Sequence, residues 1–208
     1  VLAAAGLPVA PEVILKGRTE LSEEEKQHLG LPVFVKPARG GSSIGVSKVN
    51  SWEEFPAAVD LALEDDEKIL VEPEIVGQEV EIGVLHYADG TLLASVPALL
   101  AGIDDSDEGF YGFDTKYLDN VVTAEIPAPF TPELTEKLRD MAVRAFEALN
   151  CEGLSRVDFF VTEDSVYINE INTLPGFTPI SMYPQVLAAS GVEYPALLEA
   201  LIEQALAK

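Results

Sequence analysis

A glycine- and serine-rich segment at residues 39–45, Arg-Gly-Gly-Ser-Ser-Ile-Gly, directly follows an apolar run that ends in Lys36. Because glycine has no side chain, such a loop can direct several backbone N–H groups at one anion. An ordinary turn between strands is the alternative, since neither the Walker spacing nor the dinucleotide fingerprint is present. Lys36 favours the first interpretation, because a lysine that ends a buried strand needs an anionic partner such as phosphate. The segment is therefore a candidate phosphate-binding loop.

A second cluster consists of Arg156-Val157-Asp158 and, twelve residues after Asp158, Glu170-Ile171-Asn172. Residues two apart on a strand point the same way, so two carboxylates and an amide oxygen converge if the strands pair as a hairpin. These are hard ligands suited to Mg²⁺, and Arg156 would lie close enough to stabilise phosphoryl oxygens. The alternative is a buried Arg156–Asp158 salt bridge with Glu170 and Asn172 exposed at a strand end.

Two further loops contain candidate residues for binding the substrate and the phosphates. The segment 173–178, Thr-Leu-Pro-Gly-Phe-Thr, predicts a rigid turn with free backbone N–H groups, which suits a carboxylate substrate. The segment 110–117 places aromatic residues in a loop rich in glycine and aspartate, which predicts a lid over a ligand. Lys116 at its end could reach a terminal phosphate and Tyr117 could orient a substrate; a structural loop with Lys116 in solvent is the alternative.

Glu72 ends another predicted strand, and Glu79 follows seven residues later. A carboxylate at such a strand end can accept hydrogen bonds from the amino group or the ribose hydroxyls of a nucleotide. In a chain this acidic, a solvated surface carboxylate is the alternative for both residues.

Composition limits the partners. The 208 residues carry 36 acidic and 13 basic side chains, a formal charge of −23, which opposes binding to nucleic acid or to an anionic membrane. Most of the excess acid is expected to be solubilising surface. The single cysteine, Cys151, excludes an internal disulfide and suits a reducing compartment, and no apolar run is long enough to span a bilayer. We therefore expect a cytoplasmic protein.

Mixed strands and helices without a regular strand-helix-strand rhythm predict an α+β fold. The opening segment through Arg18 is interpreted as an extended connector, and a boundary near residues 72–77 divides a small lobe, residues 1–74, from a larger lobe, residues 75–208. Capping boxes at Ser22/Glu25 and Ser51/Glu54 predict helix starts, as does Thr131-Pro132. The predicted strands are 33–36, 69–72, 155–161, 166–171 and a hairpin from 80 to 92, and the predicted helices are 22–30, 51–63, 131–149, 184–190 and 195–207.

Several motifs together resemble the D-alanine:D-alanine ligases of the ATP-grasp superfamily, over essentially the whole chain. They are Phe34-Val35-Lys36-Pro37, Gly41-Ser42-Ser43-Ile44-Gly45, Asp114-Thr115-Lys116-Tyr117, Arg156-Val157-Asp158 and Asn169-Glu170-Ile171-Asn172-Thr173-Leu174-Pro175-Gly176. The resemblance implies two α+β lobes that clamp ATP. It also implies an ADP-forming ligase that phosphorylates the carboxylate of one D-alanine, so that the amine of a second can attack the acyl phosphate and supply peptidoglycan synthesis.

The resemblance also implies roles for individual residues. Lys36, Ser42 and Ser43 would hold the phosphates, and Glu72 and Glu79 would meet the adenine amino group and the ribose. Lys116 would contact the γ-phosphate and Arg156 the transition state. Two Mg²⁺ ions, replaceable by Mn²⁺, would be held by Asp158, Glu170 and Asn172. Gly176 and Ser181 match the positions that seat the second D-alanine, while Ser42 and Tyr117 match those that help to position the substrates.

The resemblance does not extend to the family's N-terminal domain of roughly a hundred residues, the size of a separate small domain. In the family, that domain supplies a glutamate for the ammonium of the first D-alanine and a lysine for the nucleotide, and it would form any homodimer. The chain therefore resembles the central and C-terminal lobes. The alternatives are another ATP-grasp ligase, a nucleotide-binding module without turnover, and a purely structural acidic domain.

Overall fold

The computed structural model describes residues 1–41, 43–101, 123–178 and 180–207. Their packing divides the described chain into two compact units, each with its own hydrophobic core. The smaller unit comprises Ala10–Ile75, and the larger unit comprises Val1–Val9, Val76–Ala101 and the chain from Thr123 onward. The α+β class predicted from the sequence is confirmed.

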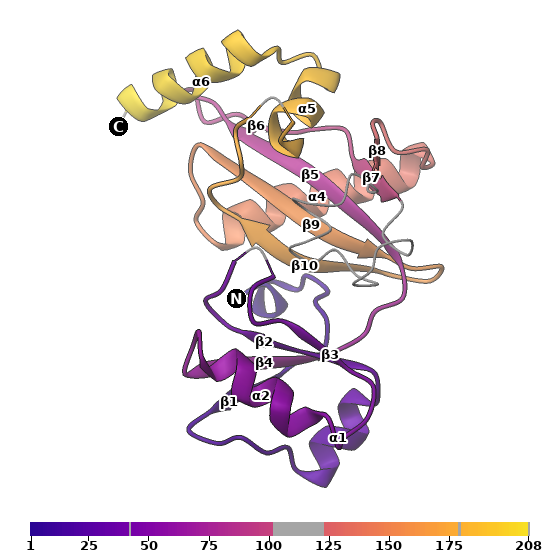
Figure 1. The fold of residues 1–208 in the computed structure, drawn as a ribbon. Helices are drawn as coiled ribbons and strands as arrows, with labels where there is room; N and C mark the ends of the chain where they lie inside the picture. The colour runs from indigo at the N-terminus through magenta and orange to yellow at the C-terminus, as the bar shows by residue number, and fades with distance from the viewer. Residues whose placement is uncertain (42, 102–122, 179, 208) are drawn as a thin grey trace. The chain divides into compact units, whose positions relative to one another are not determined.

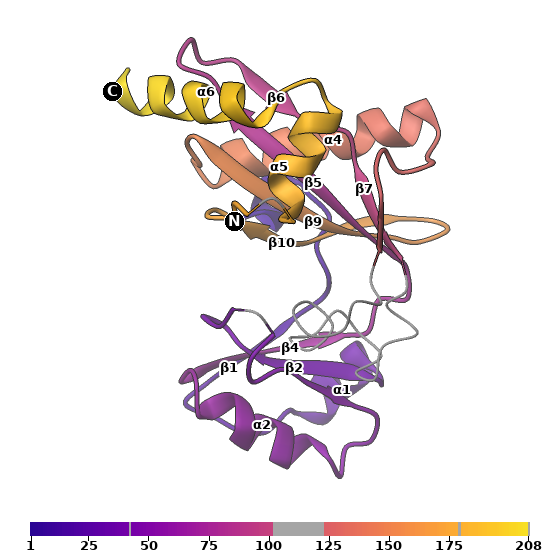
Figure 2. The same ribbon diagram turned by 45° about the horizontal axis from the view of Figure 1, so that its top comes forward.

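The smaller unit is a four-stranded antiparallel sheet backed by two helices. The strand order is β1 (Val13–Lys16), β4 (Lys68–Pro73), β2 (Val33–Pro37) and β3 (Ser47–Val49). Alternate residues of these strands are buried against α1 (Glu23–Leu29) and α2 (Phe55–Leu63), and Figure 2 shows α2 lying along one face of the sheet. The alternation leaves the other face of the sheet with polar and partly buried side chains.

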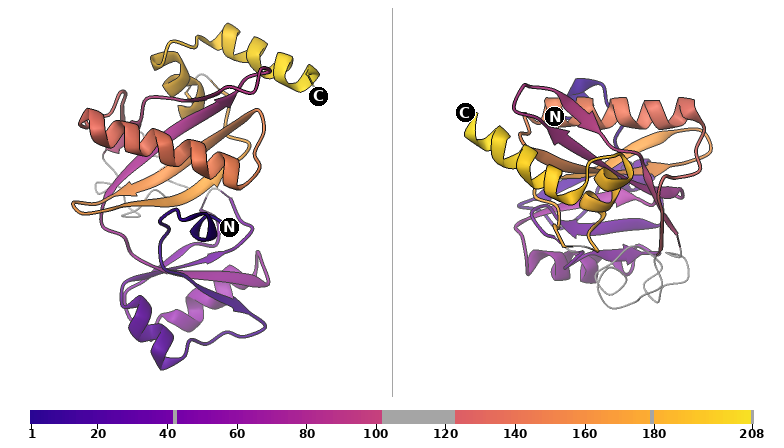
Figure 3. Two further views of the ribbon diagram at one scale, coloured as in Figure 1. Left: turned by 180° about the vertical axis from the view of Figure 1, so that it is seen from behind. Right: turned by 90° about the horizontal axis from the view of Figure 1, so that it is seen from above.

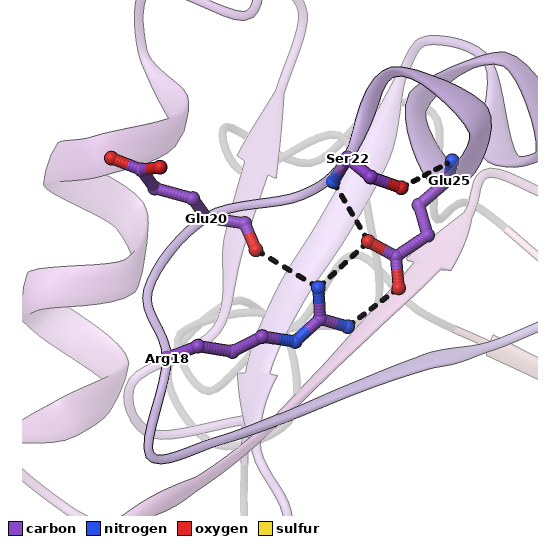
Figure 4. A network of polar contacts seen from close by, with 4 residues as sticks. All are labelled: Arg18, Glu20, Ser22 and Glu25. Atoms are coloured by element: carbon purple, nitrogen blue, oxygen red, sulfur yellow. Dashed lines mark hydrogen bonds and ion pairs between the residues drawn. The ribbon is translucent and has the colours of Figure 1, made fainter.

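Helix α1 begins with the predicted capping box. The Ser22 hydroxyl accepts a hydrogen bond from the Glu25 N–H, and the Glu25 carboxylate accepts one from the Ser22 N–H (Figure 4). Arg18 binds the same carboxylate through two nitrogens, at 2.8 and 2.5 Å, and also donates to the Glu20 carbonyl oxygen. This network satisfies donors that a helix start otherwise leaves unpaired and ties the preceding loop to the helix.

Two predictions for the smaller unit were wrong. Residues up to Arg18 are not a connector throughout, because Val13–Lys16 forms strand β1 and pairs with β4. The proposed capping box at Ser51 does not form: residues 51–54 make a turn, α2 begins at Phe55, and the Glu54 carboxylate accepts instead from the Asn50 N–H. Glu54 has helical backbone angles at the N-cap, where a capping side chain requires an extended backbone.

The larger unit contains a second antiparallel sheet. Its strand order is β10 (Val166–Asn172), β9 (Leu154–Val161), β5 (Gln78–His86), β7 (Ala98–Ala101) and β8 (Thr123–Glu125), with β6 (Leu92–Ala94) paired to β5. The predicted hairpins β5–β6 and β9–β10 are both confirmed.

Helices cover both faces of this sheet. Helix α4 (Pro132–Ala148) packs on one face, where Leu138, Ala142 and Phe146 are buried. Helices α5 (Met182–Ala189) and α6 (Tyr194–Leu206) lie on the other face (Figures 1 and 3). Thr131 caps α4 as predicted, by accepting from the Leu134 N–H. Among the described residues, none of the helices is both long and apolar enough to cross a lipid bilayer.

The first nine residues, which we assigned to the smaller lobe, pack with the larger unit instead. After a short 3-10 helix, Ala3–Ala5, Leu7 is buried in the core of the larger unit. The Ile168 N–H donates to the Pro8 carbonyl at 2.9 Å, and Val9 forms a parallel bridge with Ile168. The chain thus adds to the edge strand β10 before it enters the smaller unit. The other predicted limit, between residues 74 and 75, lies one residue from the division at Ile75.

Candidate functional site

The β9–β10 hairpin brings the predicted metal ligands onto one face of the larger sheet. Asp158 is directly opposite Glu170, and Arg156 is directly opposite Asn172. Cross-strand partners have neighbouring side chains on the same face of a sheet. The predicted pairing is therefore confirmed, and the polar face it creates lies opposite the face that packs on α4.

This arrangement depends on a β-bulge that absorbs Asn169. Ile168 pairs with Phe159 and Glu170 pairs with Asp158, so Asn169 is the extra residue. If the register set by Val166 and Val161 continued unbroken, Asn169 would oppose Asp158, and Glu170 would point toward the core. The signal in the sequence is the spacing of the core residues of β10, since Ile168 and Ile171, three apart, both contact the core under α4.

Arg156 lies among three carboxylates. Its Nε and Nη2 atoms donate to the two oxygens of Asp158, at 2.7 and 2.6 Å. Its Nε also lies 3.3 Å from the Glu81 carboxylate, on β5. Burial acts to lower the pKa of Arg156, but the hydrogen bonds with Asp158 and the charges of Asp158, Glu81 and Glu170 outweigh burial and raise that pKa. The guanidinium is therefore held permanently charged.

The chemistry of the donor set fits a magnesium ion, although Asp158 and Asn172 are engaged with protein partners in this structure. Two carboxylates and an amide oxygen are suitable ligands for an ion that keeps waters and phosphates in its remaining positions. Within the described part of the chain, no three His, Cys, Asp or Glu side chains form a metal site by themselves. Both Asp158 oxygens accept from Arg156, and Glu170 is exposed, so the side chains as placed have the geometry of the alternative, a salt bridge.

The turn after β10 brings Gly176 and Ser181 together, as a shared substrate site requires. A Cβ on Gly176 would lie 2.8 Å from the Ser181 Oγ, so only glycine fits there without a shift. The Ser181 Oγ accepts from the Thr178 N–H, and the Asn172 Oδ1 accepts from the Leu174 N–H at 3.1 Å. These bonds fix the turn locally.

In the smaller unit, Lys36 and Glu72 form an ion pair on the sheet face that the helices leave uncovered. The Lys36 Nζ lies 2.5 Å from a Glu72 oxygen, so the lysine already has an anionic partner that the sequence argument did not predict. Phe34 is directly opposite Glu72 and Lys48, and the Lys48 ammonium lies 6.0 Å from the centre of the Phe34 ring. Lys48 is a second cation on this face that was not predicted from the sequence. Its signal is its place next to the buried Val49, because adjacent strand residues point to opposite faces of the sheet.

The glycine-serine loop joins β2 to β3 and is held at its base. The Ala38 N–H donates to the Lys68 carbonyl, and Arg39 donates to both oxygens of Asp66, at 3.0 and 2.7 Å. The hydrogen bonds from Arg39 are the main reason that the pKa of the Asp66 carboxyl lies below its usual value. Gly45 has φ 72°, and a Cβ there would lie 2.6 Å from an Asp65 oxygen, so this position requires glycine. Ser43, with φ 58°, also adopts the left-handed conformation, which is costly for a serine and is found at ligand-binding loops.

The remaining predicted residues are divided between the units or lie outside the described residues. Ser42, Lys116 and Tyr117 are outside them. Glu79 lies on β5 in the larger unit, two residues before Glu81 and on the same face. Glu81 was not predicted from the sequence; its signal is an acidic residue between the buried Val80 and Ile82 of a core strand.

Comparison with known proteins identifies the class to which this fold and these residues belong. The family described as D-ala D-ala ligase C-terminus matches residues 1–203. The D-alanine–D-alanine ligase of Corynebacterium efficiens is 65% identical over 205 residues, which cover 99% of this chain and 57% of that protein.

Two solved structures have the same fold. The D-alanine–D-alanine ligase of Coxiella burnetii superposes with a TM-score of 0.83 at 36% identity, covering 99% of this chain and 54% of that one. The Bacillus anthracis ligase, complexed with ATP, superposes with a TM-score of 0.80 at 26% identity, covering 99% and 62%.

The chain therefore belongs to the D-alanine–D-alanine ligase family and has the ATP-grasp fold of its solved members. It matches the C-terminal region of that family, and it spans a little over half the length of the curated relatives.

Proposed function

We propose that this chain is the ATP- and metal-binding part of a ligase that joins two D-alanine molecules. In this reaction the γ-phosphoryl group of ATP is transferred to the carboxylate of the first D-alanine, which yields ADP and an acyl phosphate. The amine of the second D-alanine then attacks the acyl carbon and displaces phosphate. Family membership supports the reaction, and the observation that carries the site is the placement of Arg156, Asp158, Glu170 and Asn172 on one face of β9 and β10.

The residues of the smaller unit would bind the nucleotide. Lys36 and the loop with Ser42 and Ser43 would hold phosphate oxygens, and Glu72 would accept from the adenine amino group. Because Lys36 and Glu72 pair with each other in this structure, the nucleotide would replace part of that ion pair with its own phosphate and amine groups. Glu79, on β5, would accept from the ribose.

The residues of the larger unit would serve the transferred phosphoryl group. Asp158, Glu170 and Asn172 would hold Mg²⁺, two ions by family resemblance, with Mn²⁺ able to replace them. When bound, the metal neutralises phosphate charge. Arg156 is held charged by its carboxylate neighbours and would bind phosphoryl oxygens in the transition state, with Lys116 on the γ-phosphate. Gly176, Ser181 and Tyr117 would position D-alanine.

The ligase would supply peptidoglycan precursor synthesis in the cytoplasm. A homodimer would form through the family's N-terminal domain and not through the residues of this chain. The test is release of inorganic phosphate from ATP with Mg²⁺, with and without D-alanine. It is run on this chain alone and on the chain joined to the part of the Corynebacterium efficiens ligase that it does not cover. We expect the joined protein to release phosphate faster when D-alanine is present. A rate of phosphate release that does not change with D-alanine would reject the proposal.

The second candidate, a nucleotide-binding module without turnover, is distinguished by calorimetry. It predicts that the joined protein binds MgATP and releases no phosphate on addition of D-alanine. L-alanine serves as the matched control substrate, since it has the same charges and differs only in configuration.

A further inference from the structure

Glu81 belongs to the polar face of the larger sheet but has no role in the proposed function as described so far. It is directly opposite Asp158 across the β5–β9 pair, and Asp158 is directly opposite Glu170 across the β9–β10 pair. Three carboxylates thus form one row across three strands, and Arg156 lies in the adjacent row. Only 4% of the Glu81 side chain is exposed, compared with 15% for Arg156 and 13% for Asp158. A carboxylate this buried is costly unless a cation is close.

The two carboxylates near Arg156 differ in what they can do. Asp158 is the closer, since both of its oxygens accept from the guanidinium. The proposed function asks the same Asp158 to give an oxygen to Mg²⁺. The two oxygens of a carboxylate have about four lone-pair positions, so Asp158 can accept from Arg156 and bind a metal at once, but the metal draws electron density from those oxygens and weakens their hydrogen bonds with the guanidinium. The buried guanidinium then needs another anion nearby.

We infer that Glu81 is a positioning residue, which retains Arg156 on the polar face when Asp158 binds the metal. The Glu81 carboxylate is already 3.3 Å from the Arg156 Nε. Glu81 lies on β5 and Glu170 on β10, which flank the strand of Arg156, β9, on its two sides. The residue on β5 directly opposite Arg156 is Gly83, above which Leu187 and Tyr183 of α5 are packed. With glycine at that position and α5 above it, Glu81 is the β5 side chain that can anchor the guanidinium.

This inference rests on the proposed function, because it takes Asp158 as a metal ligand. Its consequence is that Glu81 acts through Arg156 and not directly on the metal. Without Glu81, Arg156 stays on Asp158 and competes with the metal. In the absence of Arg156 this contribution of Glu81 to metal binding is lost, so replacing Glu81 should then change metal binding little.

The experiment measures the metal-dependent gain in ATP affinity, defined as the Kd for ATP in EDTA divided by the Kd in excess Mg²⁺. Both constants come from calorimetry below the unfolding temperature, on the chain joined to the remainder of the Corynebacterium efficiens ligase. The variants are Glu81→Gln, Arg156→Met and the double variant, and Glu163→Gln is the matched control, an exposed carboxylate in the turn of the same hairpin. We expect Glu81→Gln to lower the gain about tenfold, the size of one charge-assisted contact, and Glu163→Gln to leave it unchanged.

The Arg156→Met background decides the mechanism. There, adding Glu81→Gln should change the gain by less than about twofold, a coupling that a merely structural residue or a direct metal ligand would not produce. If Glu81→Gln alone does not fold, Glu81→Asp replaces it, because aspartate keeps the charge but its shorter side chain withdraws the carboxylate from Arg156; Glu81→Asp should also lower the gain, and a wild-type gain in folded Glu81→Asp overturns the inference. If Glu81→Gln lowers the gain tenfold in the Arg156→Met background, or if folded Glu81→Gln keeps the wild-type gain, this inference is overturned and the proposed metal site is not. A wild type with no metal-dependent gain overturns the proposed metal site, and this inference with it.

Discussion

Replacing Asp158 by asparagine keeps the shape of the side chain and removes its charge. In the wild type, Asp158 accepts two hydrogen bonds from Arg156, at 2.7 and 2.6 Å. An asparagine accepts only one of them, and its amide N–H₂ faces the other donor. The variant therefore separates two contributions, the pairing of Arg156 and the binding of metal.

The cost to folding follows from the surroundings of Arg156. Truncating one partner of a fully buried ion pair costs about 3–5 kcal/mol, because the other charge is left unpaired. Here Glu81 remains 3.3 Å from the guanidinium, and both members of the pair keep some exposure. We therefore expect the loss of one charge-assisted hydrogen bond, about 1.5–3 kcal/mol. At about 2–4 °C per kcal/mol for a protein of this size, the Tm falls by about 3–12 °C.

The loss of metal binding is measured by the same melting curves recorded with MgATP. A ligand at a hundred times its Kd stabilises a protein by about 2.7 kcal/mol, so MgATP should raise the wild-type Tm by several degrees. Asp158→Asn should lose most of this rise, whereas Asp164→Asn, in the exposed turn of the same hairpin, should keep it. Glu170→Gln should lose the rise with a smaller change in apo stability, because Glu170 is exposed. An unchanged MgATP effect in Asp158→Asn, or global unfolding of that variant at room temperature, would refute the assignment.

Three further predictions concern the scaffold and the thiol. The hydrogen bond from Arg18 is the main cause that lowers the pKa of Glu25 from its ordinary 4.5 to about 2, so the stabilisation by Glu25 is complete above pH 4.5 and is lost as the pH falls toward 2. The difference in unfolding free energy between wild type and Glu25→Gln should shrink over that interval in urea titrations, and a difference independent of pH would contradict it. Gly83→Ala should destabilise the larger unit by about 1–3 kcal/mol, because its Cβ would lie 2.5 Å from the Leu187 Cδ2, and an unchanged Tm would contradict this packing. Burial raises the pKa of the Cys151 thiol, so iodoacetamide should alkylate it more slowly at pH 8 than it alkylates N-acetylcysteine, as followed by mass spectrometry.

Local patterns predicted most of the elements. The capping residues of α1 and α4 and the alternation of Val80, Ile82 and Val84 were sufficient, because each depends on neighbours in the chain. Short strands such as β1 were missed, since four residues carry too little periodicity to be distinguished from an extended connector. The prediction of a helix start at Ser51 was wrong because a capping motif shows that a side chain is able to cap a helix but does not fix the residue at which the helix begins.

The sequence by itself determined the types of residue at the site, the strands that carry them and the resemblance to a ligase family. The tertiary structure alone decided that Glu81 lies beside Arg156 and that residues 1–9 pack with the larger unit, where Pro8 and Val9 contact Ile168. It also decided that Glu170 faces Asp158, through a bulge at Asn169. Alternation along a strand shows which side chains share a face, but the register between strands depends on how both strands fill a common core. Such contacts join positions far apart in the chain, so they exist only once the sheet has formed.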